Sequence, residues 1–168
     1  FDTPTLSSIE YGQKISNATI SGGVVKDSLS NQDVEGDWSF ENPDAICDNG
    51  DMVKLVFTPY KSVYSPINVE VHITVVASNP KITFLEHSLS VAVGQEIKIA
   101  VKATNRYDET LAYEETLEYS YRIGSMGDWV TLSANTFIVP QDARNKKIWV
   151  RVKSKEVANK YLATTVEQ

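Results

Sequence analysis

Oxygen-bearing side chains gather in one short turn and form the best candidate for a metal site. Asp44, Asp48, Asn49 and Asp51 lie close together in the sequence, and carboxylate and amide oxygens are the ligands that Ca²⁺ prefers. Their spacing does not follow the EF-hand pattern, because its glycine and terminal glutamate are absent from the required places. The sequence therefore favours a solvated acidic turn without a cofactor, and a calcium site at Asp44, Asp48 and Asp51 is the alternative.

Nucleophiles and bases are few and scattered. His72 and His87 have no cysteine or second histidine at metal-ligand spacing. Cys47 is the single cysteine and has no histidine near it in the sequence, which is typical of a small buried apolar residue. No Gly-x-Ser-x-Gly motif marks a nucleophilic serine. The sequence predicts a protein that is not an enzyme.

Aromatic residues offer a different chemistry, stacking on a sugar ring. Tyr60 and Tyr64 lie in a loop that contains proline, and Trp149 alternates with Ile148 and Val150, which places it on the opposite face of a strand. These three aromatic residues are the candidate ligand-binding residues. In the alternative interpretation, the domain buries such rings or covers them with lysine and arginine stems.

One stretch, residues 67–84, organises the rest of the chain. Apolar residues alternate with polar ones along it, at Val69, Val71, Ile73 and Val75, which predicts a strand with one buried face. The alternation stops before Pro80, which lacks a backbone N–H and should interrupt the strand. A new alternating segment follows at once. We therefore expect two domains, residues 1–78 and residues 79–168, joined by a short linker that favours an elongated pair.

The remaining apolar residues also alternate with period two, and nowhere is there a long helical pattern. This indicates an all-β fold made of two tandem Ig-like β-sandwiches. The residues expected in the first core are Trp38, Phe40, Val69, Val71 and Ile73, and those expected in the second are Ile99, Val101, Tyr121, Trp129, Ile148 and Val150.

Composition and charge exclude several classes of protein. The chain of 168 residues has a net charge of −6, and its first 78 residues carry most of the acidic excess. An acidic surface repels the phosphate backbone, so we expect no nucleic-acid partner. No apolar run reaches the roughly 18 residues of a membrane helix, so we expect no membrane insertion. Because the chain begins with Phe1, we expect a fragment of a longer protein whose targeting segment has been lost.

Two short motifs occur once in each half and in the same order. Gly12-Gln13-Lys14-Ile15 matches Gly94-Gln95-Glu96-Ile97, and Gly36-Asp37-Trp38 matches Gly127-Asp128-Trp129. Such echoes indicate that the two halves are copies of one module.

The first half also resembles a known family over most of residues 5–75. Its motifs are Tyr11-Gly12-Gln13, Gly22-Gly23, Gly36-Asp37-Trp38-Ser39-Phe40 and Phe57-Thr58-Pro59, with Tyr64 close to the place of a further tyrosine. They are similar to motifs of the bacterial Ig-like repeats of large surface and secreted proteins. The second half is a looser match to another bacterial Ig-like module, through Gly127-Asp128-Trp129, Phe137-Ile138-Val139-Pro140 and Ile148-Trp149-Val150-Arg151-Val152.

The resemblance implies a noncatalytic structural or adhesive spacer in a multidomain bacterial cell-surface protein. Its expected location is extracellular, and its expected partners are neighbouring domains of the same protein, with a glycan or a host surface protein as a further partner. The alternative is a carbohydrate-binding accessory region of a secreted glycan-degrading enzyme, which predicts an exposed strip of Tyr and Trp.

Overall fold

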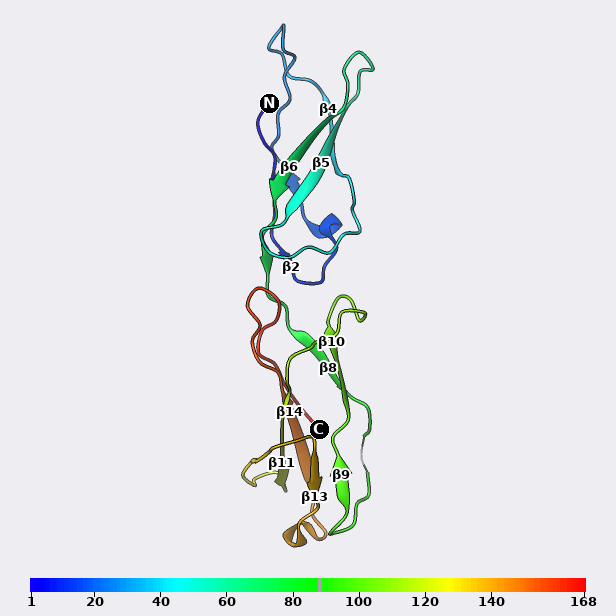
Figure 1. Ribbon diagram of the computed structural model, residues 1–168, viewed down its shortest axis with the longest axis vertical. Helices are drawn as coiled ribbons and strands as arrows, with labels where there is room; N and C mark the ends of the chain where they lie inside the picture. The colour runs from blue at the N-terminus through cyan, green and yellow to red at the C-terminus, as the bar shows by residue number, and fades with distance from the viewer. Residues whose placement is uncertain (88) are drawn as a thin grey trace. The chain divides into compact units, whose positions relative to one another are not determined.

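Strands dominate the computed structural model, which describes residues 1–87 and 89–168 (Figure 1). The chain forms two compact units, Phe1–Ala77 and Ser78–Gln168, and the division falls one residue before the predicted one. Both units are all-β, with only single turns of 3₁₀ helix. Among the described residues, no helix is long and apolar enough to cross a membrane.

The first unit contains seven strands and one 3₁₀ turn. In chain order these elements are β1 (Thr5–Leu6), β2 (Ile9–Glu10), η1 (Ile15–Asn17), β3 (Ile20–Ser21), β4 (Gly36–Phe40), β5 (Met52–Pro59), β6 (Ile67–His72) and β7 (Val75–Val76). Antiparallel pairing joins β4, β5 and β6 into one sheet and β1 and β3 into another. β2 pairs with β7 in parallel.

The core of the first unit follows the alternation of its longest strand, β5. Val53, Leu55 and Phe57 are buried there while their neighbours face outward. The predicted core residues Val71 and Ile73 are also buried. The other three predicted core residues, Trp38, Phe40 and Val69, are only partly buried and pack against the core cluster.

The described residues of the second unit, 78–87 and 89–168, form eight strands and one 3₁₀ turn. In chain order these elements are β8 (Pro80–Phe84), β9 (Glu96–Lys98), β10 (Val101–Asn105), β11 (Glu118–Ile123), β12 (Val130–Leu132), β13 (Thr136–Ile138), η2 (Gln141–Ala143), β14 (Ile148–Lys153) and β15 (Thr165–Glu167). The four-stranded sheet has the order β12-β11-β14-β15, while β8 pairs with β10 and β9 pairs with β13. As predicted, a strand starts at Pro80 and none runs through it.

β9 and β10 follow each other almost directly and share one layer with β8 and β13. The N–H of Ile99 donates to the carbonyl of Asn135, beside β13, at 2.7 Å, and the carbonyl of Ala100 accepts from the N–H of Leu85, after β8, at 2.9 Å. Neighbouring residues of an extended chain point their backbone groups to opposite sides. β8 and β13 therefore flank the β9–β10 segment on opposite edges.

One predicted core residue of the second unit is misplaced. Ile99 is buried, and Val101, Tyr121, Ile148 and Val150 pack against the core cluster. Trp129 does not belong to that cluster and lies 4.1 Å from the guanidinium carbon of Arg151, measured to the ring centroid. The prediction for Trp129 is therefore wrong. The register explains why: Val130 pairs with the inward-facing Tyr121, so the preceding residue faces outward.

The Gly-Gln echo is a repeated turn with the same hydrogen bonds. In residues 10–13, the N–H of Glu10 donates to the side-chain oxygen of Gln13 at 2.8 Å, and the carbonyl of Glu10 accepts from the N–H of Gln13 at 3.0 Å. In residues 92–95, the N–H of Ala92 donates to the side-chain oxygen of Gln95 at 2.9 Å, and the carbonyl of Ala92 accepts from the N–H of Gln95 at 3.0 Å. Gly12 (φ 91°) and Gly94 (φ 85°) both take the left-handed conformation that such a turn requires. This turn gives a residue-by-residue match between the two units.

The Gly-Asp-Trp echo, in contrast, is not structurally equivalent. Trp38 lies in β4 and packs against Phe57, with the ring centroids 5.2 Å apart and the two rings tilted by 54°. Its Nε1 donates to the carbonyl of Gly23 at 2.6 Å. Trp129 instead precedes β12 and contacts arginine side chains on the outer face of its sheet. The same three residues therefore serve an interior position in one unit and a surface position in the other.

Expression of the separate units tests whether each holds its own fold. We expect residues 1–77 and residues 78–168 each to give dispersed amide signals by NMR, because each unit has its own apolar cluster. Two disordered halves beside a folded whole chain would contradict the division into independent domains.

Candidate functional site

The side chains of the acidic turn form contacts with different parts of the first unit. Asp44 forms an ion pair with Lys14 at 2.7 Å, Asp51 Oδ2 accepts from the N–H of Asp48 at 2.9 Å, and Asn49 Oδ1 accepts from the N–H of Val75 at 2.9 Å. In residues 1–87 and 89–168, no group of three or more His, Cys, Asp and Glu side chains is arranged to hold a metal ion. The structure thus does not bring Asp44, Asp48 and Asp51 together as a calcium site.

Cys47 and the two histidines each have their own local contacts. Cys47 is partly buried and packs against the first core. Burial raises the pKa of its thiol, and the charges of Asp51 and Asp48 raise it further, which keeps the sulfur protonated and weakly nucleophilic. His72 Nδ1 lies 2.9 Å from the carbonyl oxygen of Gly50, and His87 Nδ1 lies 2.6 Å from a glutamine side-chain oxygen.

The two candidate tyrosines follow β5 in the first unit. Tyr60 is 65% exposed, and its hydroxyl donates to Asp37 Oδ1 at 2.8 Å. That hydrogen bond and the charge of Asp37 raise the pKa of Tyr60 above its ordinary value. Tyr64 is partly buried, and its N–H donates to the carbonyl of Lys61 at 3.1 Å. Tyr60 is thus the more accessible ring for a ligand, with a carboxylate beside it.

The third candidate, Trp149, lies on the outer face of the four-stranded sheet as expected from the alternation in β14. The guanidinium carbon of Arg122 lies 5.5 Å from the Trp149 ring centroid and 4.7 Å from that of Trp129. The guanidinium carbon of Arg151 also lies over the ring of Trp129, 4.1 Å from its centroid. Such contacts agree with the alternative interpretation, in which arginine stems cover the aromatic rings. Which arginine covers which ring depends on the residues that face each other across β11, β12 and β14, and local pattern does not specify these.

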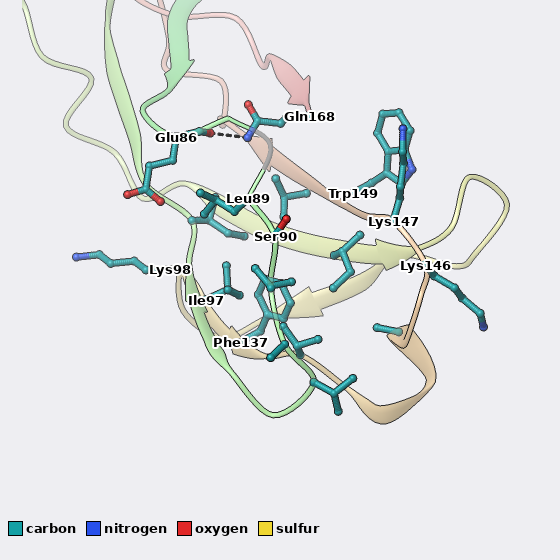
Figure 2. A pocket seen from close by; sticks show the side chains of 18 of the residues that line it. Glu86, Leu89, Ser90, Ile97, Lys98, Phe137, Lys146, Lys147, Trp149 and Gln168 are labelled. Atoms are coloured by element: carbon teal, nitrogen blue, oxygen red, sulfur yellow. Dashed lines mark hydrogen bonds between the residues drawn. The ribbon is translucent and has the colours of Figure 1, made fainter.

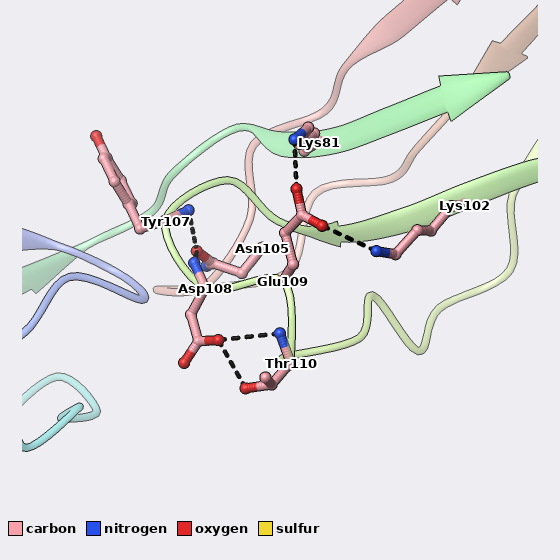
Figure 3. Close-up of polar contacts among 7 residues, drawn as sticks. All are labelled: Lys81, Lys102, Asn105, Tyr107, Asp108, Glu109 and Thr110. Atoms are coloured by element: carbon pink, nitrogen blue, oxygen red, sulfur yellow. Dashed lines mark hydrogen bonds and ion pairs between the residues drawn. The ribbon is translucent and has the colours of Figure 1, made fainter.

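A polar loop after β10 is held from within the second unit (Figure 3). Asn105 is fully buried, and its Oδ1 accepts from the N–H of Tyr107 at 2.8 Å and of Asp108 at 3.2 Å. Glu109 forms ion pairs with Lys81 and with Lys102, the latter at 2.9 Å. Hydrogen bonds to these two ammonium groups lower the pKa of Glu109 to about 2. These contacts join the loop to β8 and β10.

The low pKa of Glu109 predicts that the stability of the second unit falls with pH in the acid range. Its folded pKa lies below the unfolded value of 4.5, so its contribution is complete above that value and is lost as the pH falls towards about 2. In urea unfolding, we expect the free energy of unfolding of Glu109→Gln to change less with pH over this range than that of the wild type. Glu115→Gln removes a carboxylate for which the described part of the chain shows no ion pair, so it should follow the wild type. Equal pH profiles for Glu109→Gln and the wild type would contradict the assignment.

A cavity of about 990 Å³ lies in the second unit (Figure 2). Its interior is apolar, with contributions from Val91, Ile97, Phe137, Ile148 and Val150. Basic residues also line it, namely Lys98, Arg144, Lys146 and Lys147, together with one carboxylate, Glu86. Sequence reasoning missed this cavity because its two walls are remote in the chain.

Comparison with known proteins identifies no relative. No family model, no curated protein and no solved structure matches this chain.

Proposed function

We propose that the chain is a tandem pair of Ig-like β-sandwiches that serves as a noncatalytic structural or adhesive spacer in a multidomain bacterial cell-surface protein. Strand pairing in the second unit supports the sandwich. One layer is β12-β11-β14-β15 and the other contains β8, β9–β10 and β13. Both layers contribute buried residues to one apolar cluster, which is how two packed sheets form a core.

The observation that carries the proposal is the repeated Gly-Gln turn. In both units it follows the first strands, has the same two hydrogen bonds and places glycine at positive φ. A turn so closely repeated at the same stage of two consecutive units supports a duplicated β-module. Such modules, placed one after another, suit a passive role in presenting other domains.

Resistance to stretching is the property that a spacer needs, and the first unit has a suitable arrangement. β2 lies near its start and β7 lies at its end, and the two strands pair in parallel. The N–H of Ile9 donates to the carbonyl of Thr74 at 3.1 Å, and the N–H of Tyr11 donates to that of Val76 at 2.8 Å. Tension applied through the chain therefore loads both hydrogen bonds together rather than one after the other.

Single-molecule stretching of the whole chain between two handle domains tests this function. We expect two separate unfolding events, each releasing roughly 3.5 Å per residue of its unit, with the first unit giving way at the higher force. Extension without discrete events would contradict a load-bearing spacer.

A carbohydrate-binding accessory region is the second candidate, and one observation favours it. Tyr60 exposes 65% of its surface and has the Asp37 carboxylate held at its hydroxyl. Affinity electrophoresis in gels containing soluble polysaccharides tests this candidate. Retardation that is lost in Tyr60→Ala but kept in Tyr107→Ala, which removes another exposed tyrosine, would support glycan binding.

A further inference from the structure

Two arginines on the outer face of the four-stranded sheet have few acceptors in the described part of the chain. The inward residues Tyr121 and Val150 pack against the core cluster, so their neighbours Arg122 and Arg151 point to the opposite face. Arg122 Nη2 lies 4.0 Å from Glu167 Oε2, which is too long for a hydrogen bond. Arg151 forms no ion pair with any described residue.

The inner ends of both arginine side chains are also without an acceptor. The Nε atoms of Arg122 and Arg151 are buried, and among the residues that the structure describes neither donates a hydrogen bond. Removing part of a guanidinium group from water without pairing it costs free energy. An anion that pairs with the rest of each group would offset this cost.

Trp129 holds the flat faces of the two guanidinium groups. Their central carbons lie 4.7 Å (Arg122) and 4.1 Å (Arg151) from the centroid of its ring. Stacking covers the faces of a guanidinium group, whereas its N–H donors lie along the edge. These edges are planar forks that match the two oxygens of a carboxylate. The outer face therefore presents two preorganised carboxylate-binding groups.

A third cation continues this surface along β14. Lys153 lies two residues after Arg151, so the two side chains leave the same face of the strand roughly 6.7 Å apart, twice the rise per residue. Glu118 faces Lys153 across the sheet, but its carboxylate forms an ion pair with Lys155 at 3.8 Å. Lys153 has no ion pair within residues 1–87 and 89–168. Cations thus recur on this face at the repeat of a strand.

This repeat indicates the kind of partner that fits. Alternate side chains of an extended polypeptide project from one side with the same spacing of roughly 6.7 Å. When such a segment lies along β14, acidic residues at alternate positions would each face one cation. Arginine clusters recognise acidic segments through paired hydrogen bonds of this type. The carboxylates of an acidic polysaccharide, in contrast, follow the length of its sugar rings and not the repeat of a strand.

We propose that the outer face of the four-stranded sheet binds an extended acidic segment of a partner polypeptide. Carboxylates at alternate residues of the segment pair with Arg122, Arg151 and Lys153. Trp129 is a positioning residue, which orients the two guanidinium groups without touching a carboxylate. The proposal goes beyond the spacer function, because it concerns one face of the second unit and does not depend on how either unit bears load.

A labelled eight-residue peptide in which glutamate alternates with threonine is the probe. Its control is an isomer whose glutamates stand in adjacent pairs at the two ends, so that no two occupy alternate positions. We expect the alternating peptide to bind the whole chain saturably and about fivefold more tightly than the isomer. In NMR spectra, the Nε–Hε signals of Arg122 and Arg151 should shift. The affinity should fall as salt is added, because exposed charges are screened.

Three substitutions of cations test the assignment of the site. Arg151→Gln removes one fork and should weaken binding about tenfold, and Lys153→Gln, which leaves the stacking intact, should weaken it about threefold. Arg106→Gln is the matched control and should bind like the wild type. Arg106 also lies over an aromatic ring, 5.1 Å from the centroid of Tyr107, but in the loop after β10.

Trp129→Ala tests the positioning role. The variant removes no charge, so the dependence of binding on salt should stay that of the wild type. The affinity itself should fall, because the two guanidinium groups lose the ring that orients them.

Five results would overturn the proposal. They are absence of saturable peptide binding, equal affinity of the two peptides, equal weakening by Arg106→Gln and Arg151→Gln, NMR shifts confined to residues outside this sheet, and saturable binding of polygalacturonate with none of the alternating peptide. The last result would assign the face to an acidic glycan instead of a polypeptide.

Discussion

Trp38→Ala will lower the free energy of unfolding of the first unit by about 3 kcal/mol, whereas Trp129→Ala will lower that of the second unit by about 1 kcal/mol or less. Trp38 packs against the first core, contacts the tilted ring of Phe57 and donates to the carbonyl of Gly23. Its removal leaves a void and an unpaired carbonyl. Replacing Trp129 removes its contacts with Arg122 and Arg151 on the outer face of the four-stranded sheet.

Urea unfolding of the whole chain, followed by an NMR signal from each unit, measures both effects in one experiment. The two residues share the same Gly-Asp-Trp context, so each variant is a control for the other. An unchanged midpoint for Trp38→Ala would contradict the register of β4 on β5. A larger loss for Trp129→Ala than for Trp38→Ala would contradict the outward orientation of Trp129.

Tyr11→Pro will lower the force needed to unfold the first unit and raise its unfolding rate about fivefold, the factor that corresponds to the loss of about 1 kcal/mol. The turn at residues 10–13 accepts proline at its second position, because φ there is near −60°. The substitution removes the N–H that donates to Val76. The variant thus lacks one of the hydrogen bonds that join the start of the unit to its end.

Two controls isolate the hydrogen bond from the side chain. Tyr11→Ala removes the ring but keeps the N–H, so it should unfold at a higher force than Tyr11→Pro. Val93→Pro makes the same change in the second unit, where the described residues provide no acceptor for that N–H, so the unfolding force of that unit should be nearly unchanged. Equal forces for Tyr11→Pro and Tyr11→Ala would show that the pairing of β2 with β7 does not bear load.

Local pattern alone was sufficient for much of the architecture. Alternation predicted the buried faces of β5 and β14, because each side chain of a strand points opposite to its neighbours. Pro80 predicted an interruption between two strands, because proline cannot donate to the ladder of a preceding strand, and β7 ends before it while β8 begins at it. The Gly-Gln echo indicated a repeated module, and the structure shows that it forms the same turn twice, since positive φ and a side-chain cap depend only on residues close in the sequence. These properties are fixed within a few residues of chain.

The candidate sites depended on contacts between distant residues, and here sequence was insufficient. Asp44 forms an ion pair with Lys14, thirty residues away in the sequence, and does not form a metal site with the other aspartates. Trp129 was expected in the core but lies on the outer face beside the arginines. The register between strands decides this, and no local pattern specifies that register. The cavity of the second unit is lined by segments that are remote in the sequence, among them residues 91–93 and β14. Only the pairing of strands across the fold, and the space it leaves, decided these features.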